Sequence, residues 1–137
     1  MLEYLFVYGT LRKAQNGSQH PDLKQAVFLS DAHVNGKLFL IAHYPGVVLG
    51  DNGHHQTVHG EIYHLPDPVK QLQKLDDYEE CSPQFPFPHE YQRTTCIATL
   101  TDGSTLRTWI YTFQYATDKL THLSNGDFWA YLPASYD

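Results

Sequence analysis

Three features are scarce in this sequence: cysteine, positive charge and long apolar runs. Cys81 and Cys96 are its two cysteines, too few for a disulfide framework, so we expect free thiols in a reducing compartment. Nine lysine and arginine residues stand against fifteen aspartate and glutamate residues, a formal net charge of −6 that argues against nucleic-acid binding. The chain has neither an apolar run long enough to span a bilayer nor a basic leader segment. We therefore expect a cytoplasmic protein without membrane contacts.

Length and composition indicate a globular protein. The 137 residues fit a single domain over residues 1–137, and a hydrophobic content of 42% with 18% charged residues is typical of a folded chain. Ten tyrosines, seven phenylalanines and two tryptophans favour a strand-rich fold with an aromatic-lined pocket, although core packing alone also uses such residues.

Short strand-like segments dominate the chain. Residues 2–8 are mostly apolar and indicate a strand with both faces covered, and residues 58–65 indicate a half-buried strand. Asp102-Gly103 between two β-rich runs predicts a hairpin of residues 91–101 and 104–113. A further strand segment is expected over residues 26–29. Residues 34–41 are expected to form a tight turn that enters a strand, and residues 43–50 a Pro-Gly turn that leads into a short apolar strand, with another turn at residues 51–55.

One helix is predicted after the strand at residues 58–65. Asp67 is the expected cap, Pro68 fits the first helical position, and Val69, Leu72 and Leu75 recur at helical spacing, for about two turns ending near residues 76–78. We also expect a helical turn at residues 21–23, an extended loop at the three prolines of residues 79–88, and short helical pieces over residues 120–132. Together these elements predict an α+β fold, a small barrel or strongly curved sheet with peripheral helices.

The turn after the first strand is a candidate binding loop. Gly9 allows a sharp turn and close approach of a ligand, and the N–H groups of Gly9, Thr10 and Leu11 can together face a carboxylate or an oxyanion. Thr10 adds a hydroxyl group, and Tyr8 adds a phenol. The alternative is a buried strand that ends in an ordinary glycine turn.

Four carboxylates stand at the end of the predicted helix: Asp76, Asp77, Glu79 and Glu80. The carboxyl end of a helix is unfavourable for acids, and crowded like charges raise carboxylate pKa values. A carboxyl group with a raised pKa is suited to general acid/base catalysis, whereas the alternative is a solvated acidic corner.

Other chemistries find less support. His54, His55, His59 and His64 lie close in sequence but without the spacing of a metal motif, so we expect no metal. No serine-hydrolase elbow is present, and the acids beside Cys81 raise a thiol pKa rather than lower it.

Tyr91 and Arg93 are two residues apart on a predicted strand and therefore share a face. Arg93 is a candidate for binding a substrate carboxylate. The alternative is an ion pair with Asp76 or Asp77.

Six short segments, in this order and spacing, resemble the γ-glutamylcyclotransferase-like family, in the branch of γ-glutamylamine cyclotransferase and AIG2-like proteins. The segments are residues 7–12 (VYGTLR), 44–48 (YPGVV), 58–63 (VHGEIY), 75–79 (LDDYE), 91–93 (YQR) and 126–129 (GDFW). The resemblance spans almost the whole chain.

The resemblance implies a small mixed β-barrel of about six or seven strands with short flanking helices. It makes residues 8–11 the substrate-binding loop and Glu79 the acid/base, with Glu80 as its rival in register. Further substrate contacts are then expected from Tyr44, Tyr91 and Arg93. The proline-rich insert before Tyr91 is longer than is usual in the family, and we expect it to edge the pocket and to influence specificity.

The implied reaction is an intramolecular aminoacyl transfer. A γ-glutamyl amine or γ-glutamyl amino acid is cyclised to 5-oxoproline with release of the amine, and neither metal nor cofactor is required. A second interpretation is a non-catalytic binding module that retains the carboxylate pocket. A third is transfer to another acceptor, which would yield other products.

Overall fold

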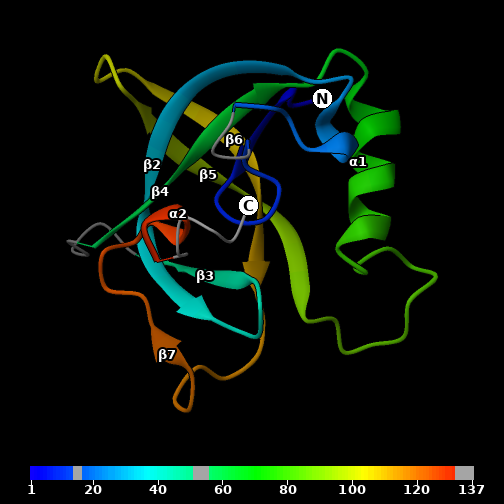
Figure 1. The fold of residues 1–137 in the computed structure, drawn as a ribbon. Helices are drawn as coiled ribbons and strands as arrows, with labels where there is room; N and C mark the ends of the chain where they lie inside the picture. The colour runs from blue at the N-terminus through cyan, green and yellow to red at the C-terminus, as the bar shows by residue number, and fades with distance from the viewer. Residues whose placement is uncertain (14–16, 51–55, 132–137) are drawn as a thin grey trace.

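The computed structural model describes residues 1–13, 17–50 and 56–131, and its centre is a closed five-stranded barrel (Figure 1). The barrel strands are β1 (Tyr4–Val7), β2 (Val27–Leu40), β4 (Thr57–His64), β5 (Tyr91–Leu100) and β6 (Thr105–Phe113). They follow the order β2-β4-β1-β6-β5, and pairing between β2 and β5 closes the ring. Because β1 runs parallel to β6 and the other pairs are antiparallel, the predicted small mixed barrel is confirmed.

Two further strands extend the sheet from the second half of β2. They are β3 (Pro45–Leu49) and β7 (Thr121–His122), and both pair antiparallel with β2. The strand β7 falls where we expected helical pieces, so that prediction is wrong for residues 121–122. The short helix α2 (Phe128–Tyr131) agrees with it, as does η1 (Pro21–Leu23) with the predicted helical turn.

The strand β2 is continuous where the sequence predicted a strand, a turn and a second strand. Asn35 is the last residue of β2 that pairs with β4, and Gly36 is the first that pairs with β3. A Cβ atom at Gly36 would lie 2.8 Å from the Val48 carbonyl oxygen. The glycine therefore lets β2 lie close to β3 at the point where β2 changes its pairing from β4 to β3. The prediction of a turn here was wrong.

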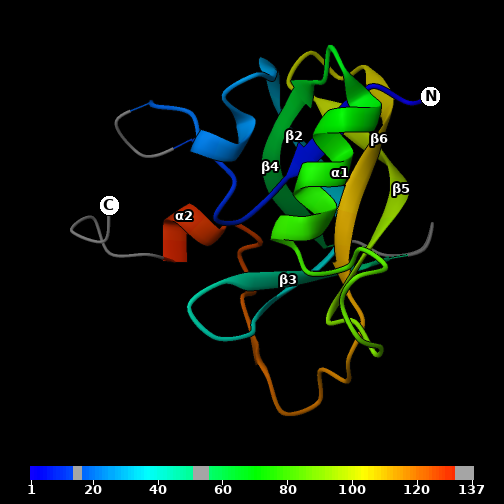
Figure 2. The ribbon, with the colours of Figure 1, turned by 90° about the vertical axis from the view of Figure 1, so that its right-hand side faces the viewer.

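Apolar side chains of β1 serve two cores because neighbouring residues of a strand face opposite sides. Phe6 lies inside the barrel, whereas Leu5 and Val7 point outward to a second cluster that contains Leu72 and Leu75 of α1 (Pro68–Tyr78). Figure 2 shows this helix lying against the outside of the barrel. The predicted strand with both faces covered is confirmed.

Helix α1 begins at Pro68 as predicted, but it has 11 residues, about three turns rather than two. Asp67 occupies the cap position without a side-chain capping bond, and its N–H donates instead to Oε1 of Gln71 (2.8 Å). No helix of the described residues is long and apolar enough to cross a membrane.

The carboxyl-terminal segment is tied to the turn after β1 by a charged network. The guanidinium group of Arg12 donates from Nη1 to Oδ1 of Asp127 (2.8 Å) and from Nε to Oε2 of the buried Glu61 (3.4 Å). Trp129 donates its indole N–H to the carbonyl oxygen of Lys13 (2.7 Å). Residues from three of the six family-like segments therefore meet here, and Arg12, Glu61 and Asp127 have a structural role.

Candidate functional site

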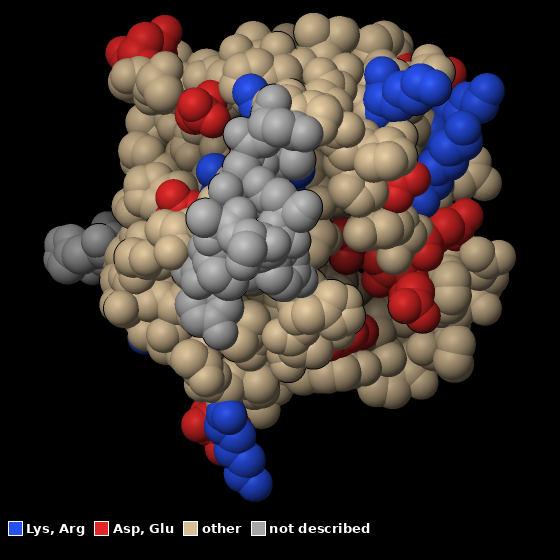
Figure 3. Space-filling model, in the orientation of Figure 1, with Lys and Arg blue, Asp and Glu red and all other residues tan. Residues whose placement is uncertain are grey.

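A cavity of about 550 Å³ opens where β1 ends. Its walls come from the turn after β1, the loop before β3, the carboxyl end of α1, the proline-rich loop, and the strands β5 and β6 with the residues that follow β6. In Figure 3, acidic side chains gather around a hollow near the carboxyl end of α1. Segments far apart in the sequence thus share one space.

Tyr8 and Gly9 are held by packing at the start of the predicted binding loop. The Tyr8 hydroxyl group donates to the carbonyl oxygen of Tyr111 (2.6 Å) and accepts from the N–H of Val47 (3.3 Å). Burial raises the pKa of Tyr8 well above its ordinary value, so this phenol stays protonated. A Cβ atom at Gly9 would lie 2.7 Å from the Pro45 ring, so only a glycine allows the backbone to come this close to Pro45.

The turn itself lines the cavity. The N–H of Arg12 donates to the carbonyl oxygen of Gly9 (3.0 Å), and this bond does not use the N–H groups of Gly9, Thr10 and Leu11. The Thr10 hydroxyl group lies 3.4 Å from the hydroxyl group of Tyr78. All four predicted loop residues, 8–11, line the cavity.

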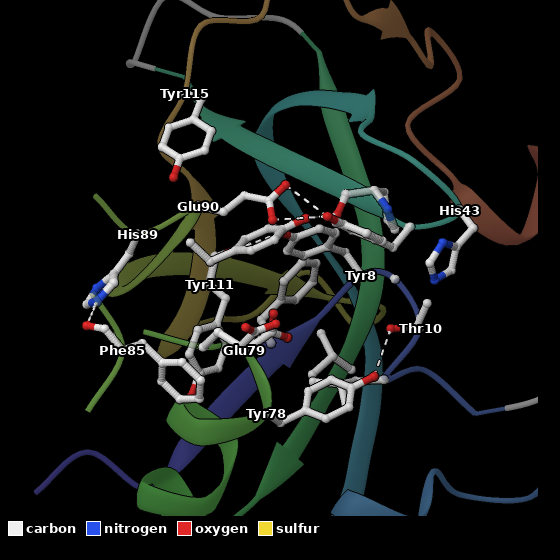
Figure 4. A pocket seen from close by; sticks show the side chains of 18 of the residues that line it. Tyr8, Thr10, His43, Tyr78, Glu79, Phe85, His89, Glu90, Tyr111 and Tyr115 are labelled. Atoms are coloured by element: carbon white, nitrogen blue, oxygen red, sulfur yellow. Dashed lines mark hydrogen bonds between the residues drawn. The ribbon is translucent and has the colours of Figure 1, made fainter. Parts of the chain in front are cut away.

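Glu79 caps α1 and projects from the helix end into the same cavity (Figure 4). Its N–H donates to the carbonyl oxygen of Leu75 (2.9 Å), which fixes the backbone, while its carboxyl group has no hydrogen bond or ion pair with any other described residue. Burial, and then the negative charge of Glu90, raise the pKa of Glu79 to about 7. This carboxyl group can therefore accept and donate a proton near neutrality.

The raised pKa was predicted for a different reason. We expected crowding of Asp76, Asp77 and Glu80 at the helix end, but burial and Glu90 are the causes. Glu80, the rival in register, also lines the cavity but is exposed and has a left-handed backbone with φ of 56°.

Tyr44 and Tyr91 line the cavity as expected, and their hydroxyl groups already have partners. The Tyr44 hydroxyl group donates to both carboxylate oxygens of Glu90 (2.9 and 3.0 Å), and that of Tyr91 donates to the carbonyl oxygen of Pro45 (2.7 Å). Burial and the hydrogen bond to Glu90 raise the pKa of Tyr44 to about 12. Both tyrosines therefore supply aromatic surface rather than a proton.

Arg93 lies outside the residues that line the cavity. Its guanidinium group forms two bonds to Asp76 (2.8 and 3.2 Å) and lies over the ring of Trp109 (4.3 Å). Asp76 also accepts from the hydroxyl group of Tyr111 (2.7 Å), which does line the cavity. The structure thus contains the ion pair that was the alternative interpretation of Arg93. Through Asp76 the pair holds Tyr111, a residue that lines the cavity.

The structure adds residues to the site that the sequence reasoning missed. They are His43, Tyr78, Tyr111 and Tyr115, together with Phe85, His89 and Glu90, which were not named singly but belong to the insert that was expected to edge the pocket and does line it. Glu90 directly precedes the predicted strand at Tyr91, but nothing in its spacing distinguishes it from other acids. The predicted aromatic-lined pocket, in contrast, is confirmed.

The remaining sequence hypotheses concern metals and cysteines. His54 and His55 lie outside the described residues, and the rest of the described chain holds no group of three or more His, Cys, Asp or Glu residues that could bind a metal. Cys81 and Cys96 are both free, as predicted. Burial and the neighbouring Asp76 raise the pKa of Cys81 to about 11, as expected for a thiol among acids.

Comparison with known proteins gives a consistent family assignment. The family model described as "Gamma-glutamyl cyclotransferase, AIG2-like" matches residues 5–130. The Escherichia coli K12 protein named "Gamma-glutamylcyclotransferase family protein YtfP" is 34% identical over 124 residues, 90% of this chain and 93% of YtfP. The solution structure of Escherichia coli ytfP aligns with a TM-score of 0.60 at 31% identity, over 90% of this chain and 94% of that one.

Two more distant relatives extend the comparison. The crystal structure of a mouse AIG2-like protein aligns with a TM-score of 0.61 at 28% identity, over 99% of this chain and 88% of that one. A Niallia circulans protein named "Gamma-L-glutamyl-butirosin B gamma-glutamyl cyclotransferase" is 32% identical over 111 residues, 80% of this chain and 65% of that protein. With its barrel, its cavity and these matches, the chain belongs to the gamma-glutamyl cyclotransferase, AIG2-like family.

Proposed function

We propose that this chain is an enzyme that cyclises a γ-glutamyl amine or γ-glutamyl amino acid to 5-oxoproline and releases the amine. The observation that carries the proposal is the position of Glu79. Its carboxyl group, which has no hydrogen-bond partner among the described residues and a pKa of about 7, lies in one cavity with the backbone turn at residues 8–11. The free thiols of Cys81 and Cys96 support a reducing location, and we propose the cytoplasm.

Glu79 would act first as a base and then as an acid. Its carboxylate takes a proton from the α-ammonium group of the substrate, and the freed amine attacks the γ-carbonyl carbon to close a five-membered ring. The carbonyl oxygen becomes an oxyanion. When the oxyanion re-forms the carbonyl, the bond to the leaving nitrogen breaks, and the Glu79 carboxyl group returns its proton to that nitrogen. The ring nitrogen loses its second proton to water or to the released amine, which leaves the neutral lactam.

The rest of the cavity would hold the substrate in the folded shape that ring closure requires. Holding amine and carbonyl together can contribute about 7–11 kcal/mol to lowering the barrier. The N–H groups of Gly9, Thr10 and Leu11 are suited to hold the α-carboxylate or the oxyanion. Tyr44 and Tyr91 would pack against the substrate as aromatic walls.

The test compares Glu79→Gln with the wild type by the release of 5-oxoproline from a panel of γ-glutamyl amines, amino acids and peptides. Since acid/base catalysis contributes typically 10²–10⁴-fold, we expect kcat to fall by about that factor. Glu80→Gln is the matched control, because it removes the neighbouring exposed carboxylate, and it should retain most of the turnover.

Three results would contradict the proposal. Unchanged turnover in Glu79→Gln would remove Glu79 from the mechanism. A folded wild type that binds γ-glutamyl compounds but releases no 5-oxoproline would be a binding module. Products other than 5-oxoproline would indicate transfer to a different acceptor.

A further inference from the structure

The two walls of the cavity that the proposed reaction uses belong to different elements. Residues 8–11 follow β1, and Glu79 ends α1. One direct contact between them joins the hydroxyl groups of Thr10 and Tyr78, which are 3.4 Å apart in an exposed position. Such a contact holds the two walls only weakly, because the bond is long and water competes for both groups.

Tyr111 of β6 bonds to both walls. Its carbonyl oxygen accepts from the hydroxyl group of Tyr8 (2.6 Å), and its own hydroxyl group donates to Oδ1 of Asp76 (2.7 Å). Asp76 and Glu79 are three residues apart at the end of α1, so they are neighbours on the helix surface. One buried residue thereby connects the binding turn to the helix end that carries Glu79. Figure 4 shows Tyr8, Tyr111 and Glu79 around the same part of the cavity.

The hairpin of β5 and β6 fixes Asp76 from two strands. Arg93 of β5 lies directly opposite Tyr111 in the strand register, so both side chains extend from the same face of the hairpin. Nε and Nη2 of Arg93 donate to Asp76 at 2.8 and 3.2 Å, and the Arg93 guanidinium group lies over the ring of Trp109, two residues before Tyr111. The carboxylate of Asp76 is therefore held in one position by donors from both strands.

The hydroxyl group of Tyr111 does not serve as an acid or a base. Burial and the bond to Asp76 raise the pKa of Tyr111 well above its ordinary value, so the phenol remains protonated. Its proton is directed at Asp76 rather than at the cavity. What the hydroxyl group contributes is a fixed distance between β6 and the end of α1.

We propose that Tyr111 is a positioning residue, which through its bond to Asp76 holds the end of α1 so that the Glu79 carboxyl group meets a substrate bound at residues 8–11. This inference rests on the cyclotransferase function proposed above and assigns a further residue to the geometry of that reaction. Without the hydroxyl group the helix end is free to move away from the barrel, and water then reaches the Glu79 carboxyl group. A misplacement of about 1 Å can cost roughly 100-fold in rate.

The test is Tyr111→Phe, which removes the hydroxyl group and keeps both the ring and the carbonyl oxygen that binds Tyr8. Asp76 retains its pair with Arg93, so neither charge is left alone. We expect kcat for 5-oxoproline release at pH 8, where Glu79 is mostly ionised, to fall roughly 10- to 100-fold. KM should stay close to the wild-type value, because residues 8–11 keep their anchor.

The pKa of Glu79 gives a second measurement that does not depend on turnover. Its side-chain carboxyl ¹³C signal, identified by comparison with Glu79→Gln, is followed through a pH titration of the wild type and of Tyr111→Phe. We expect the pKa to fall from about 7 toward the ordinary value of 4.5, because burial is the largest cause of the shift and the displaced carboxyl group gains water. The neighbouring acids of the cavity, Glu80 and Glu90, are the same in both proteins.

Tyr63→Phe is the matched control. Tyr63 is a buried tyrosine of β4 whose hydroxyl group also donates to a carboxylate that pairs with an arginine, Glu61 with Arg12. Each variant loses one buried bond of the same kind, but Tyr63 lies outside the described residues that line the cavity. The control should keep the wild-type kcat and the wild-type pKa of Glu79. The same changes in Tyr63→Phe would trace the effect to a general loss of stability and overturn the inference.

A double variant tests the route through Asp76. If Tyr111 acts by holding Asp76, Tyr111→Phe/Asp76→Ala should lose no more kcat than Asp76→Ala alone, and losses that multiply would contradict this route. A lower pKa of Glu79 in Tyr111→Phe supports the inference even if no γ-glutamyl compound yields 5-oxoproline, which separates it from the proposed function. A pKa that stays near 7, or a kcat equal to that of an active wild type, overturns it.

Discussion

The carboxyl group of Glu79 is placed at a cost to stability. An ionised carboxylate that loses water and gains no described partner favours the unfolded state, in which it is hydrated. Such a cost is typical of functional sites, where a shifted pKa serves the chemistry. The same residue should therefore link catalysis to the pH dependence of folding.

This link gives a prediction for stability. The pKa of Glu79 is raised from 4.5 to about 7 on folding, so the folded state binds its proton more tightly. The penalty is absent below pH 4.5, grows as the pH rises to 7, and is complete above that value. We expect Glu79→Gln to increase the free energy of unfolding at pH 8 by as much as about 3 kcal/mol and to change it little at pH 4.

Urea denaturation of both proteins at the two pH values measures the effect. Glu80→Gln serves as the control, because it removes the neighbouring carboxylate, which is exposed. A loss of stability in Glu79→Gln at pH 8 would show that the carboxylate has a stabilising partner, contrary to the structure.

At the scale of elements, the end of α1 aims Glu79 at the cavity. The N–H of Cys81 donates to the carbonyl oxygen of Asp76 (2.9 Å), and the N–H of Glu80 donates to that of Asp77 (3.1 Å). These two bonds form a Schellman motif, which requires a left-handed residue after the cap, usually glycine. Here that residue is Glu80, with φ of 56°.

A left-handed backbone costs a side-chain-bearing residue roughly 1–2 kcal/mol, of which the greater flexibility of unfolded glycine offsets roughly 0.4–1. We therefore expect Glu80→Gly to increase the free energy of unfolding by up to about 1 kcal/mol. Lys74→Gly, at an exposed position inside α1, is the contrasting control and should lose about 1 kcal/mol. If Glu80→Gly were destabilised as much as Lys74→Gly, the strain at Glu80 would be refuted; thermal or urea unfolding provides the measurement.

Elements with strong local signals could be predicted from the sequence. The hairpin around Asp102-Gly103 and the start of α1 at Pro68 follow from turn chemistry and backbone restraints, and both are observed. The prediction of a turn at Gly36 was wrong, because the sequence does not distinguish a glycine that permits close contact between strands from a glycine that forms a turn. The short strand β7 depends on pairing with β2, a long-range contact that local composition does not encode.

The residues of the candidate site, too, could be predicted from the sequence only in part. Residues 8–11 and Glu79 were predicted from a glycine turn, an acidic helix end and a family resemblance, and their catalytic roles remain predictions. Glu90 was missed because its importance comes from the cavity and from Tyr44, not from its neighbours in sequence. Arg93 was proposed for the substrate from strand periodicity, which does not reveal that Asp76 of α1 lies beside it.

For the whole molecule, the barrel provides a fixed frame between the turn after β1 and the end of α1. The turn is anchored on one side by Arg12, which bridges Glu61 and Asp127, and on the other by Tyr8, which bonds to the backbone of β3 and β6. The helix packs on the barrel through Leu72 and Leu75. Two segments separated by about seventy residues are thereby held around one cavity.

The most direct test of this account follows both walls of the cavity in a single NMR titration with 5-oxoproline, the proposed product. Amide signals of Gly9, Thr10 and Leu11 report on the turn, and the side-chain carboxyl ¹³C signal of Glu79, assigned by its loss in Glu79→Gln, reports on the helix end. We predict that the free carboxyl group titrates with a pKa near 7 and that both sets of signals move with one Kd. A Glu79 signal that titrates near 4.5 and stays unmoved while the amide signals respond would contradict a shared catalytic cavity.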